Sequence, residues 1–196
     1  MGSKLEEMSL SQLGELFPII ISDHEPIWKK RYQTEVIALN NIIGQENIIR
    51  INHYGSTSIP GLKAKPTIDI LLEIDNNTDL EQLIASIKSI GYHYSHQPSN
   101  PPPHMMFMKG YTEHGFEGQA YHLHVRYFGD WDELYFREYL LQYPEVAKEY
   151  ENLKLKLMEQ HRNDREAYTR GKTDFIKEAT KKAREEIGNR YAIPLS

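Results

Sequence analysis

The sequence contains no cysteine, so neither a disulfide framework nor a thiolate metal site can form. It also lacks an apolar run of the roughly 20 residues that a membrane-spanning helix needs. The N-terminal stretch carries Lys4, Glu6 and Glu7, unlike the basic and then apolar pattern of a signal peptide. These absences predict a cytoplasmic protein with no membrane partner.

A basic excess is absent as well. The formal net charge of −5 at pH 7 argues against broad nucleic-acid binding, which usually goes with an excess of lysine and arginine. A local basic pocket for a phosphate group remains compatible with that charge. The length of 196 residues suits one domain with a real hydrophobic core, with or without a helical appendage.

Strand and helix patterns alternate along the chain. The strongest strand pattern covers residues 67–74, where every second side chain is apolar and is expected to face a core. Weaker strand patterns cover 48–54, 92–96, 104–109 and 119–128, the last two expected to form a long hairpin. Helical spacing is found in residues 1–16, between Pro26 and Gly44, in 80–90, and from Asp130 onward. The sequence predicts an α/β (α+β) fold: a mixed sheet of about four or five strands, flanking helices and a C-terminal helical bundle.

The loop after the second predicted strand lacks bulky side chains. It reads Gly55-Ser56-Thr57-Ser58, in which glycine permits a close backbone approach and the hydroxyl groups donate hydrogen bonds. Such a loop suits either an anionic ligand or a simple tight turn. Lys65 precedes Pro66, which holds it in extended geometry, so its ammonium group points either at a bound phosphate or into solvent.

Asp69 lies within the most apolar predicted strand. A buried charge without a partner is costly, so this aspartate needs a metal, a catalytic role or a salt bridge. Glu73 is expected to be a surface or structural residue. The two carboxylates lie roughly 13 Å apart along a strand, which is too far to share an ion with ligands at about 2.1 Å.

The string His53-Tyr54-Gly55-Ser56-Thr57-Ser58-Ile59-Pro60-Gly61-Leu62, followed by Lys65-Pro66-Thr67-Ile68-Asp69-Ile70, resembles the GrpB family, whose fold is nucleotidyltransferase-like. Further matches are Trp28, His122-Leu123-His124-Val125, Tyr168-Thr169 and Gly171-Lys172. The resemblance covers about residues 18–185. It implies an N-terminal extension over 1–17 and a single GrpB-like domain over 18–196, with an α/β core in 18–129 and helices in 130–196.

The resemblance implies a Gly-Ser turn, a pair of acids two residues apart on the next strand, and a third acid on a later strand. These acids hold one or two Mg²⁺ ions against nucleotide phosphates. This sequence departs from that pattern, because the positions two residues before and after Asp69 are Thr67 and Leu71. The pair of acids is therefore broken. The later acid is replaced by a histidine pair.

His122 and His124 are expected to share one face of a strand with Arg126. Their Cα atoms lie roughly 6.6 Å apart, which lets two imidazoles converge on one metal with Asp69. Such a set favours Zn²⁺, Mn²⁺ or Ni²⁺ over Mg²⁺. Alternatively the histidines line an anion pocket or hydrogen-bond Asp69 without a metal. Glu113 and Glu117, in the preceding connection, offer a further carboxylate.

Tyr168 and Lys172 lie one helical turn apart and share a face. Either they present a ring and a cation to a ligand-binding cleft, or they form an ordinary half-exposed pair. His161, Arg162 and Arg165 are expected to belong to a solvated helix end.

Two functions remain open at this point. In the first, the protein transfers a nucleotidyl or other phosphate group to a small acceptor, with Asp69 and His124 as catalytic residues. A divalent metal (Mg, Mn or Zn) would be bound by Asp69, His122 and His124. The nucleotide, or other phosphorylated small molecule, would be bound by Gly55, Ser56, Thr57, Lys65, Arg126, Tyr168 and Lys172. In the second, the protein is a non-catalytic module that binds a ligand or partner, or acts like a chaperone, with a degenerate active site.

Overall fold

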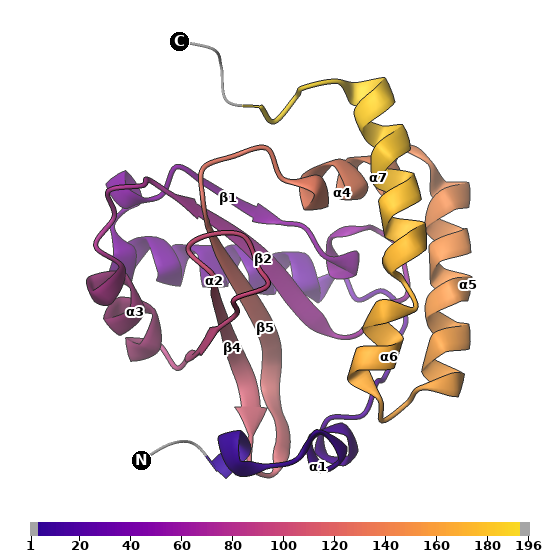
Figure 1. Ribbon diagram of the computed structural model, residues 1–196, viewed down its shortest axis with the longest axis horizontal. Coiled ribbons are helices and arrows are strands. Elements are labelled where there is room, and N and C mark those ends of the chain that lie inside the picture. The colour runs from indigo at the N-terminus through magenta and orange to yellow at the C-terminus, as the bar shows by residue number, and fades with distance from the viewer. Residues whose placement is uncertain (1–3, 193–196) are drawn as a thin grey trace.

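The computed structural model describes residues 4–192, so the first three residues of the predicted leading helix lie outside the described part. Its centre is a five-stranded sheet in the order β1-β2-β5-β4-β3 (Figure 1). The strands are β1 (Arg50–His53), β2 (Thr67–Ile74), β3 (His93–His96), β4 (Met105–Thr112) and β5 (Gly115–Tyr127). Strands β2 and β5 pair in parallel, whereas the other neighbours are antiparallel. The sheet is therefore mixed.

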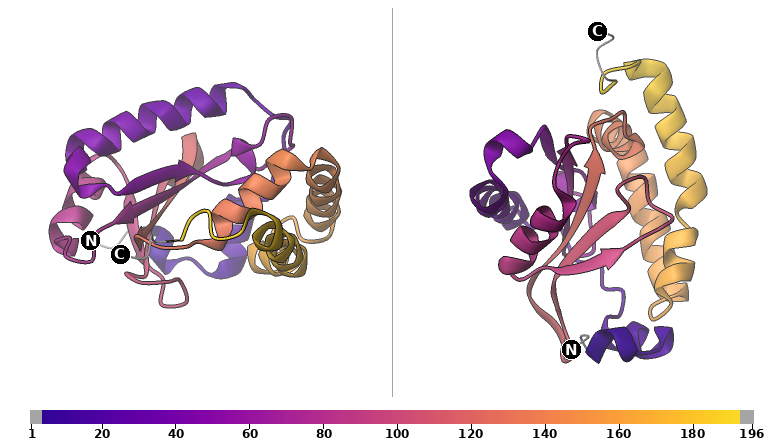
Figure 2. Two further views of the ribbon diagram at one scale, coloured as in Figure 1. Left: turned by 90° about the horizontal axis from the view of Figure 1, so that it is seen from above. Right: turned by 60° about the vertical axis from the view of Figure 1, so that its left-hand side comes forward.

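Helices cover both faces of this sheet. They are α1 (Leu10–Leu16), α2 (Ile27–Ile43), α3 (Leu80–Ser89), α4 (Asp132–Gln142), α5 (Pro144–Gln160), α6 (Arg165–Arg170) and α7 (Thr173–Ile187), with short 3₁₀ turns η1 (Lys4–Glu7), η2 (Gln45–Asn47) and η3 (Ser56–Ser58). Figure 2 shows the purple and magenta helices α2 and α3 on one side of the sheet and the orange and yellow helices α4 to α7 on the other. The predicted fold class, a mixed α/β sheet flanked by helices, is confirmed. No helix within residues 4–192 is long and apolar enough to cross a membrane.

The main core lies between β2, β5 and the helices α2 and α3. The alternating side chains of β2 that were expected to face a core are fully buried there, together with Trp28 and Leu39 of α2. Because helices cover the second face too, the remaining residues of β2 are also buried, with Asp69 as the one exception. The strand with the strongest sequence pattern therefore places one accessible carboxylate beneath the C-terminal helices.

Three details differ from the sequence-based expectations. Within the described residues, the helical pattern of 1–16 forms two separate pieces, η1 and α1, rather than one helix. The hairpin of β4 and β5 continues almost to its turn, because Gly110, at φ 85°, takes up a register shift between Lys109 and Tyr111 that leaves the strands paired beyond it. Glu73 is completely buried, so the surface alternative is wrong and the structural one holds. Its carboxylate binds the Arg50 guanidinium and accepts a hydrogen bond from the Gly129 N–H at 3.2 Å.

Candidate functional site

A cavity of about 500 Å³ lies between the Asp69 face of the sheet and the C-terminal helices; we call it the central cavity. Its walls come from η3 and its flanking loop, from β2 and β5, and from α4 to α7. It brings together eight residues that the sequence singled out: Gly55, Ser56, Lys65, Asp69, His122, His124, Tyr168 and Lys172.

Asp69, His122 and His124 converge at the sheet side of this cavity, and we call them the metal-side cluster. Asp69 and His122 are neighbours in the parallel register of β2 and β5. The Nδ1 atom of His122 lies 3.1 Å from Oδ1 of Asp69. One potential ligand atom from each of the three residues lies within 4.8 Å of the others. The spacing is close enough for the three side chains to hold one cation.

His124 supplies an unsatisfied nitrogen. Its Nδ1 atom is buried and has no hydrogen-bond partner among the described residues. Burial, with a smaller contribution from His122, lowers the pKa of His124 to about 4, so its imidazole is neutral at pH 7. A neutral imidazole is the form that binds metals. A buried polar atom without a partner is unusual in a native protein, and a bound cation would satisfy it.

The charge state of Asp69 also suits a cation. Burial by itself raises the pKa of this carboxyl group, but the hydrogen bond with His122 and the nearby His122, His124 and Lys65 more than offset it. The pKa therefore lies below its ordinary value, and Asp69 is a carboxylate at neutral pH.

Tyr111 orients His122 from the other side. Its hydroxyl oxygen lies 2.7 Å from Nε2 of His122. Nδ1, which donates to Asp69 in the ligand-free protein, would exchange that proton for a metal, and Nε2–H would then donate to the Tyr111 hydroxyl oxygen. Partners of this kind fix the ring orientation of metal-binding histidines. Tyr111 was not among the predicted site residues, because its role depends on how β4 pairs with β5.

Gly55 is present because Asp69 leaves no room for a side chain. A Cβ atom at this position would lie 2.0 Å from Oδ2 of Asp69. Its backbone is extended, with φ −69° and ψ 179°, so the requirement is steric rather than conformational. The Tyr54 N–H donates to the Asp69 carbonyl at 3.1 Å and ties the loop to β2. The Gly-Ser loop therefore lies directly against the carboxylate.

The helix side of the cavity carries positive charge. Lys65 and Lys172 point at the ring of Tyr168, with their Nζ atoms 5.9 and 4.4 Å from its centroid. Lys154 and Arg165 line the same cavity and were missed. Lys154 lies four residues after Tyr150 and three before Leu157, so the helical spacing of α5 contained its signal. Arg165 was expected at a solvated helix end, and nothing in its local sequence contradicts that expectation.

Four of the residues considered from the sequence do not line the cavity. Thr57 is buried, and its hydroxyl lies 2.8 Å from Nε2 of His53 and donates to the Thr67 carbonyl at 3.0 Å. The Arg126 guanidinium makes two hydrogen bonds to Glu133, at 2.9 and 2.6 Å. Glu113 lies in the turn of the β4–β5 hairpin, and Glu117 lies near the start of β5.

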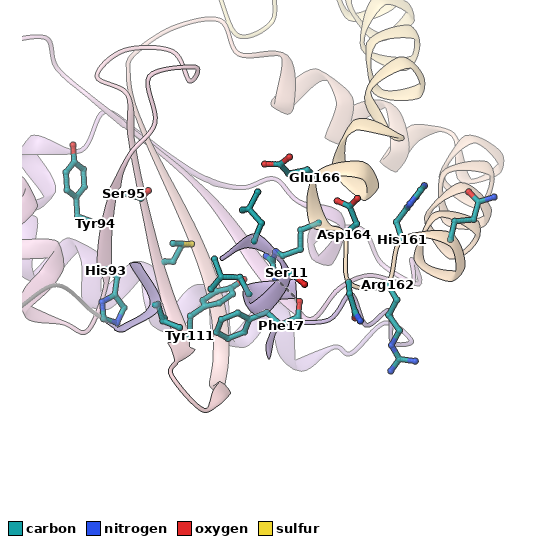
Figure 3. A pocket seen from close by; sticks show the side chains of 17 residues that line it. Ser11, Phe17, His93, Tyr94, Ser95, Tyr111, His161, Arg162, Asp164 and Glu166 are labelled. Carbon is teal, nitrogen blue, oxygen red and sulfur yellow. Dashed lines mark hydrogen bonds between the residues drawn. The ribbon is translucent and has the colours of Figure 1, made fainter. Parts of the chain in front are cut away.

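A second and larger cavity, of about 810 Å³, lies where α1 meets the loop before α6; we call it the N-terminal cavity. Figure 3 shows Phe17 and Tyr111 beside each other, with His93 and Tyr94 to one side of them and His161 and Arg162 to the other. Arg165 lines both cavities, and its guanidinium donates to the Phe17 carbonyl at 3.2 Å. The N-terminal segment therefore contributes to the position of one cation of the central cavity.

Comparison with known proteins places these features in context. A family model described as GrpB protein matches residues 18–182. The glutamate-rich protein GrpB of Alkalihalophilus pseudofirmus is 36% identical over 164 residues, a match that covers 82% of this chain and 92% of that protein. The UPF0157 protein PA4798 of Pseudomonas aeruginosa is 35% identical over 153 residues, covering 78% of this chain but only 62% of the longer relative. The crystal structure of conserved protein GrpB from Enterococcus faecalis aligns with a TM-score of 0.73 at 30% identity, covering 86% of this chain and 99% of that one.

Proposed function

Since this chain belongs to the GrpB family, we propose that its central cavity binds a phosphorylated small molecule, such as a nucleotide, together with a divalent metal ion. Asp69, His122 and His124 are the proposed ligands of the metal. The observation that carries the proposal is the buried Nδ1 of His124, which has no hydrogen-bond partner within residues 4–192 and belongs to the metal-side cluster beside the Gly55-Ser56 loop.

The donor set favours some metals over others. Two imidazole nitrogens and one carboxylate oxygen suit Zn²⁺ or Mn²⁺ better than Mg²⁺, which prefers oxygen ligands. Three protein ligands leave positions for water or for a phosphate oxygen of the ligand. When bound, such a metal neutralises phosphate charge and lowers the pKa of a hydroxyl group or water that contacts it.

Other residues of the cavity would hold the ligand. Ser56 brings a hydroxyl group to the wall, and Gly55 lets the backbone approach. Lys65 and Lys172 would place positive charge against phosphate oxygens, and the half-buried position of both strengthens that attraction relative to bulk water. The proposed reaction is transfer of a nucleotidyl or other phosphate group to a small acceptor.

A non-catalytic binding module is the second candidate. It is favoured by the side chains that flank Asp69 on its face, because Thr67 and Leu71 provide no second carboxylate. The other two acids that line the cavity are already paired, Asp132 with Arg184 and Glu133 with Arg126. A site with one available carboxylate binds a metal more readily than it runs a two-metal reaction.

Calorimetric titration with Zn²⁺, Mn²⁺ and Mg²⁺ tests the metal site. We expect one Zn²⁺ or Mn²⁺ per chain and at least a roughly tenfold weaker affinity in the Asp69→Asn and His124→Gln variants. His114→Gln, on an exposed hairpin turn, is the matched control and should bind as the wild type does. Equal metal affinity of wild type and Asp69→Asn would contradict the proposed site.

A screen of ribonucleotides and sugar phosphates with each metal tests the ligand. Turnover that disappears in Asp69→Asn would support the transfer reaction. Saturable binding without turnover would support the binding module instead. If no phosphorylated compound binds with any metal, the proposed function is wrong in both forms.

A further inference from the structure

Positive charge exceeds negative charge on the walls of the central cavity. Four cationic side chains line it, and we call them the cationic cluster: Lys65, Lys154, Arg165 and Lys172. Three acids line the same cavity, but Asp132 is bound to Arg184 at 2.6 Å and Glu133 to Arg126 at 2.6 Å. Asp69 is hydrogen-bonded to His122. Among the described residues, Asp69 is thus the one acid lining the cavity without a cationic partner of its own, and its single charge offsets at most one of the four positive charges.

Neutral groups hold these cations in place. Lys65 and Lys172 contact the buried ring of Tyr168. The Lys154 ammonium donates to the Lys63 carbonyl and lies 4.9 Å from the ring centroid of Tyr150. Aromatic faces and carbonyl oxygens orient a cation but carry no net charge. The positive charge is fixed in position, and most of it is left uncompensated.

Such an arrangement is costly without an anion. Lys154 is only 2% exposed, and burial of an ammonium group disfavours its charged form. Burial, followed by repulsion from Arg165 and Lys172, lowers the pKa of Lys65 to about 7. Burial also lowers the pKa of Lys172 to about 8, with Asp69 opposing this shift and Arg165 adding to it. A bound anion would stabilise the charged form of both lysines.

We infer that the cationic cluster is a metal-independent subsite for a phosphate group that carries two negative charges. The cations come from three parts of the chain: Lys65 from the loop before β2, Lys154 from α5, and Arg165 and Lys172 from the start of α6 and the turn between α6 and α7. A tetrahedral phosphate presents oxygens in several directions and matches such a set better than a planar carboxylate of single charge.

The inference deepens the proposed function and rests on it for the identity of the cavity as a ligand site. If the metal-side cluster holds one phosphate oxygen and the cationic cluster another group, the ligand has two separate anionic parts. The substrate class is then a diphosphate or longer phosphate chain, or a bisphosphate, rather than a simple phosphate monoester.

Pyrophosphate binding to protein freed of metal on a chelating resin tests the subsite. We expect saturable binding at pH 7 and at least a roughly tenfold weaker affinity in Lys65→Met and in Lys172→Met. Lys156→Met is the control, because Lys156 is exposed on the same helix as Lys154. Malonate, a dicarboxylate, should bind at least about tenfold more weakly than pyrophosphate. Absence of saturable pyrophosphate binding to the wild type, equal affinity in Lys65→Met, or equally tight malonate binding would overturn the inference.

Thermal unfolding provides a second readout on the same variants. Burial and the nearby Arg165 disfavour the charged form of Lys172, so Lys172→Met should raise the melting temperature of the ligand-free protein by about 2 °C or more. A lysine with a structural role would give a lower melting temperature, and that result would also overturn the inference.

The variant Asp69→Asn separates this inference from the proposed function. It should lose metal affinity but bind pyrophosphate, in the absence of metal, at least as tightly as the wild type. The reason is that it removes a negative charge that acts on Lys65 and Lys172. Wild-type protein that binds pyrophosphate but no metal would refute the metal site and leave the subsite standing. Loss of pyrophosphate binding in Asp69→Asn would refute the subsite alone.

Discussion

At the scale of single residues, Gly55 connects the most recognisable motif of the sequence to the chemistry of the site. The motif suggested a phosphate-binding loop, whereas the structure adds a steric reason for the glycine. Its Cα atom lies against the Asp69 carboxylate, so the loop and the strand cannot be altered independently.

Gly55→Ala should therefore weaken metal binding although it replaces none of the proposed metal-binding residues. The added methyl group would push the Asp69 carboxylate away from His122 and His124, and we expect at least a roughly tenfold loss of Zn²⁺ affinity by calorimetry. Pro60→Ala, at an exposed position in the same loop, is the control. Unchanged Zn²⁺ affinity in Gly55→Ala would show that Asp69 is not a ligand.

Tyr111 offers a test at the same scale. In Tyr111→Phe the ring stays, but the hydroxyl that contacts Nε2 of His122 is lost. We expect Zn²⁺ affinity to fall by about 10-fold, which is in the range for partners behind a metal ligand. Tyr94→Phe, at a half-buried position on β3, should bind Zn²⁺ as the wild type does. Equal affinity in both variants would remove Tyr111 from the site.

At the scale of elements, Glu73 joins β1, β2 and the turn that leads from β5 to α4. Its carboxylate holds Arg50, and the Arg50 guanidinium also donates to the Gly129 carbonyl at 2.6 Å. Glu73→Ala would leave a half-buried arginine and the Gly129 N–H without their partner. We expect it to lower the free energy of unfolding by about 3 kcal/mol, measured by urea denaturation.

The matched control for that measurement is Glu149→Ala, since Glu149 is exposed on α5. A change within about 0.5 kcal/mol is expected for a surface substitution of this kind. Equal losses in the two variants would mean that the buried pair adds nothing to stability.

The elements also show where sequence reasoning succeeds. Periodicity located β2, α2 and the hairpin of β4 and β5, because those elements bury one continuous apolar pattern each. Alternation along β5 placed His122 and His124 on a common face, which the structure shows. These inferences depend on local spacing only.

Side-chain partners that come together only through tertiary packing could not be predicted from local spacing. Arg126 looked like a ligand residue because it shares the histidine face, but the start of α4 brings Glu133 to it. Arg165 reaches the cavity because the loop before α6 packs on the segment around Phe17. Glu73 looked compatible with the surface because the C-terminal helices that cover β2 are distant in sequence.

At the scale of the whole molecule, three lysines in the walls of the central cavity make stability depend on pH. Lys65, Lys154 and Lys172 have pKa values lowered by burial to about 7, 7 and 8 in the folded protein, against 10.5 for an ordinary lysine. Between about pH 7 and pH 10.5 the unfolded chain therefore binds more protons than the folded one. The free energy of unfolding therefore rises with pH over that window.

Ligand-free protein should accordingly melt at a higher temperature at pH 9 than at pH 7, by about 3 °C or more. The comparison stops at pH 9 because ordinary tyrosines begin to ionise near pH 10. A double variant, Lys65→Met with Lys172→Met, should show a smaller rise, whereas Lys156→Met should behave as the wild type. A wild-type melting temperature that falls from pH 7 to pH 9 would show that these lysines stay charged in the folded state.

The parallel pairing of β2 with β5 has a consequence for the time course of folding. Asp69 and His122 are partners in that register although 53 residues separate them. Contacts of such separation form late, after local hairpins and helices, because the chain must first close a long loop. A slip of one residue would turn the histidines towards α2 and α3. During refolding, affinity for Zn²⁺ should therefore appear only with the slowest phase, and a chain that collapses in the wrong register should be compact yet unable to bind the ion.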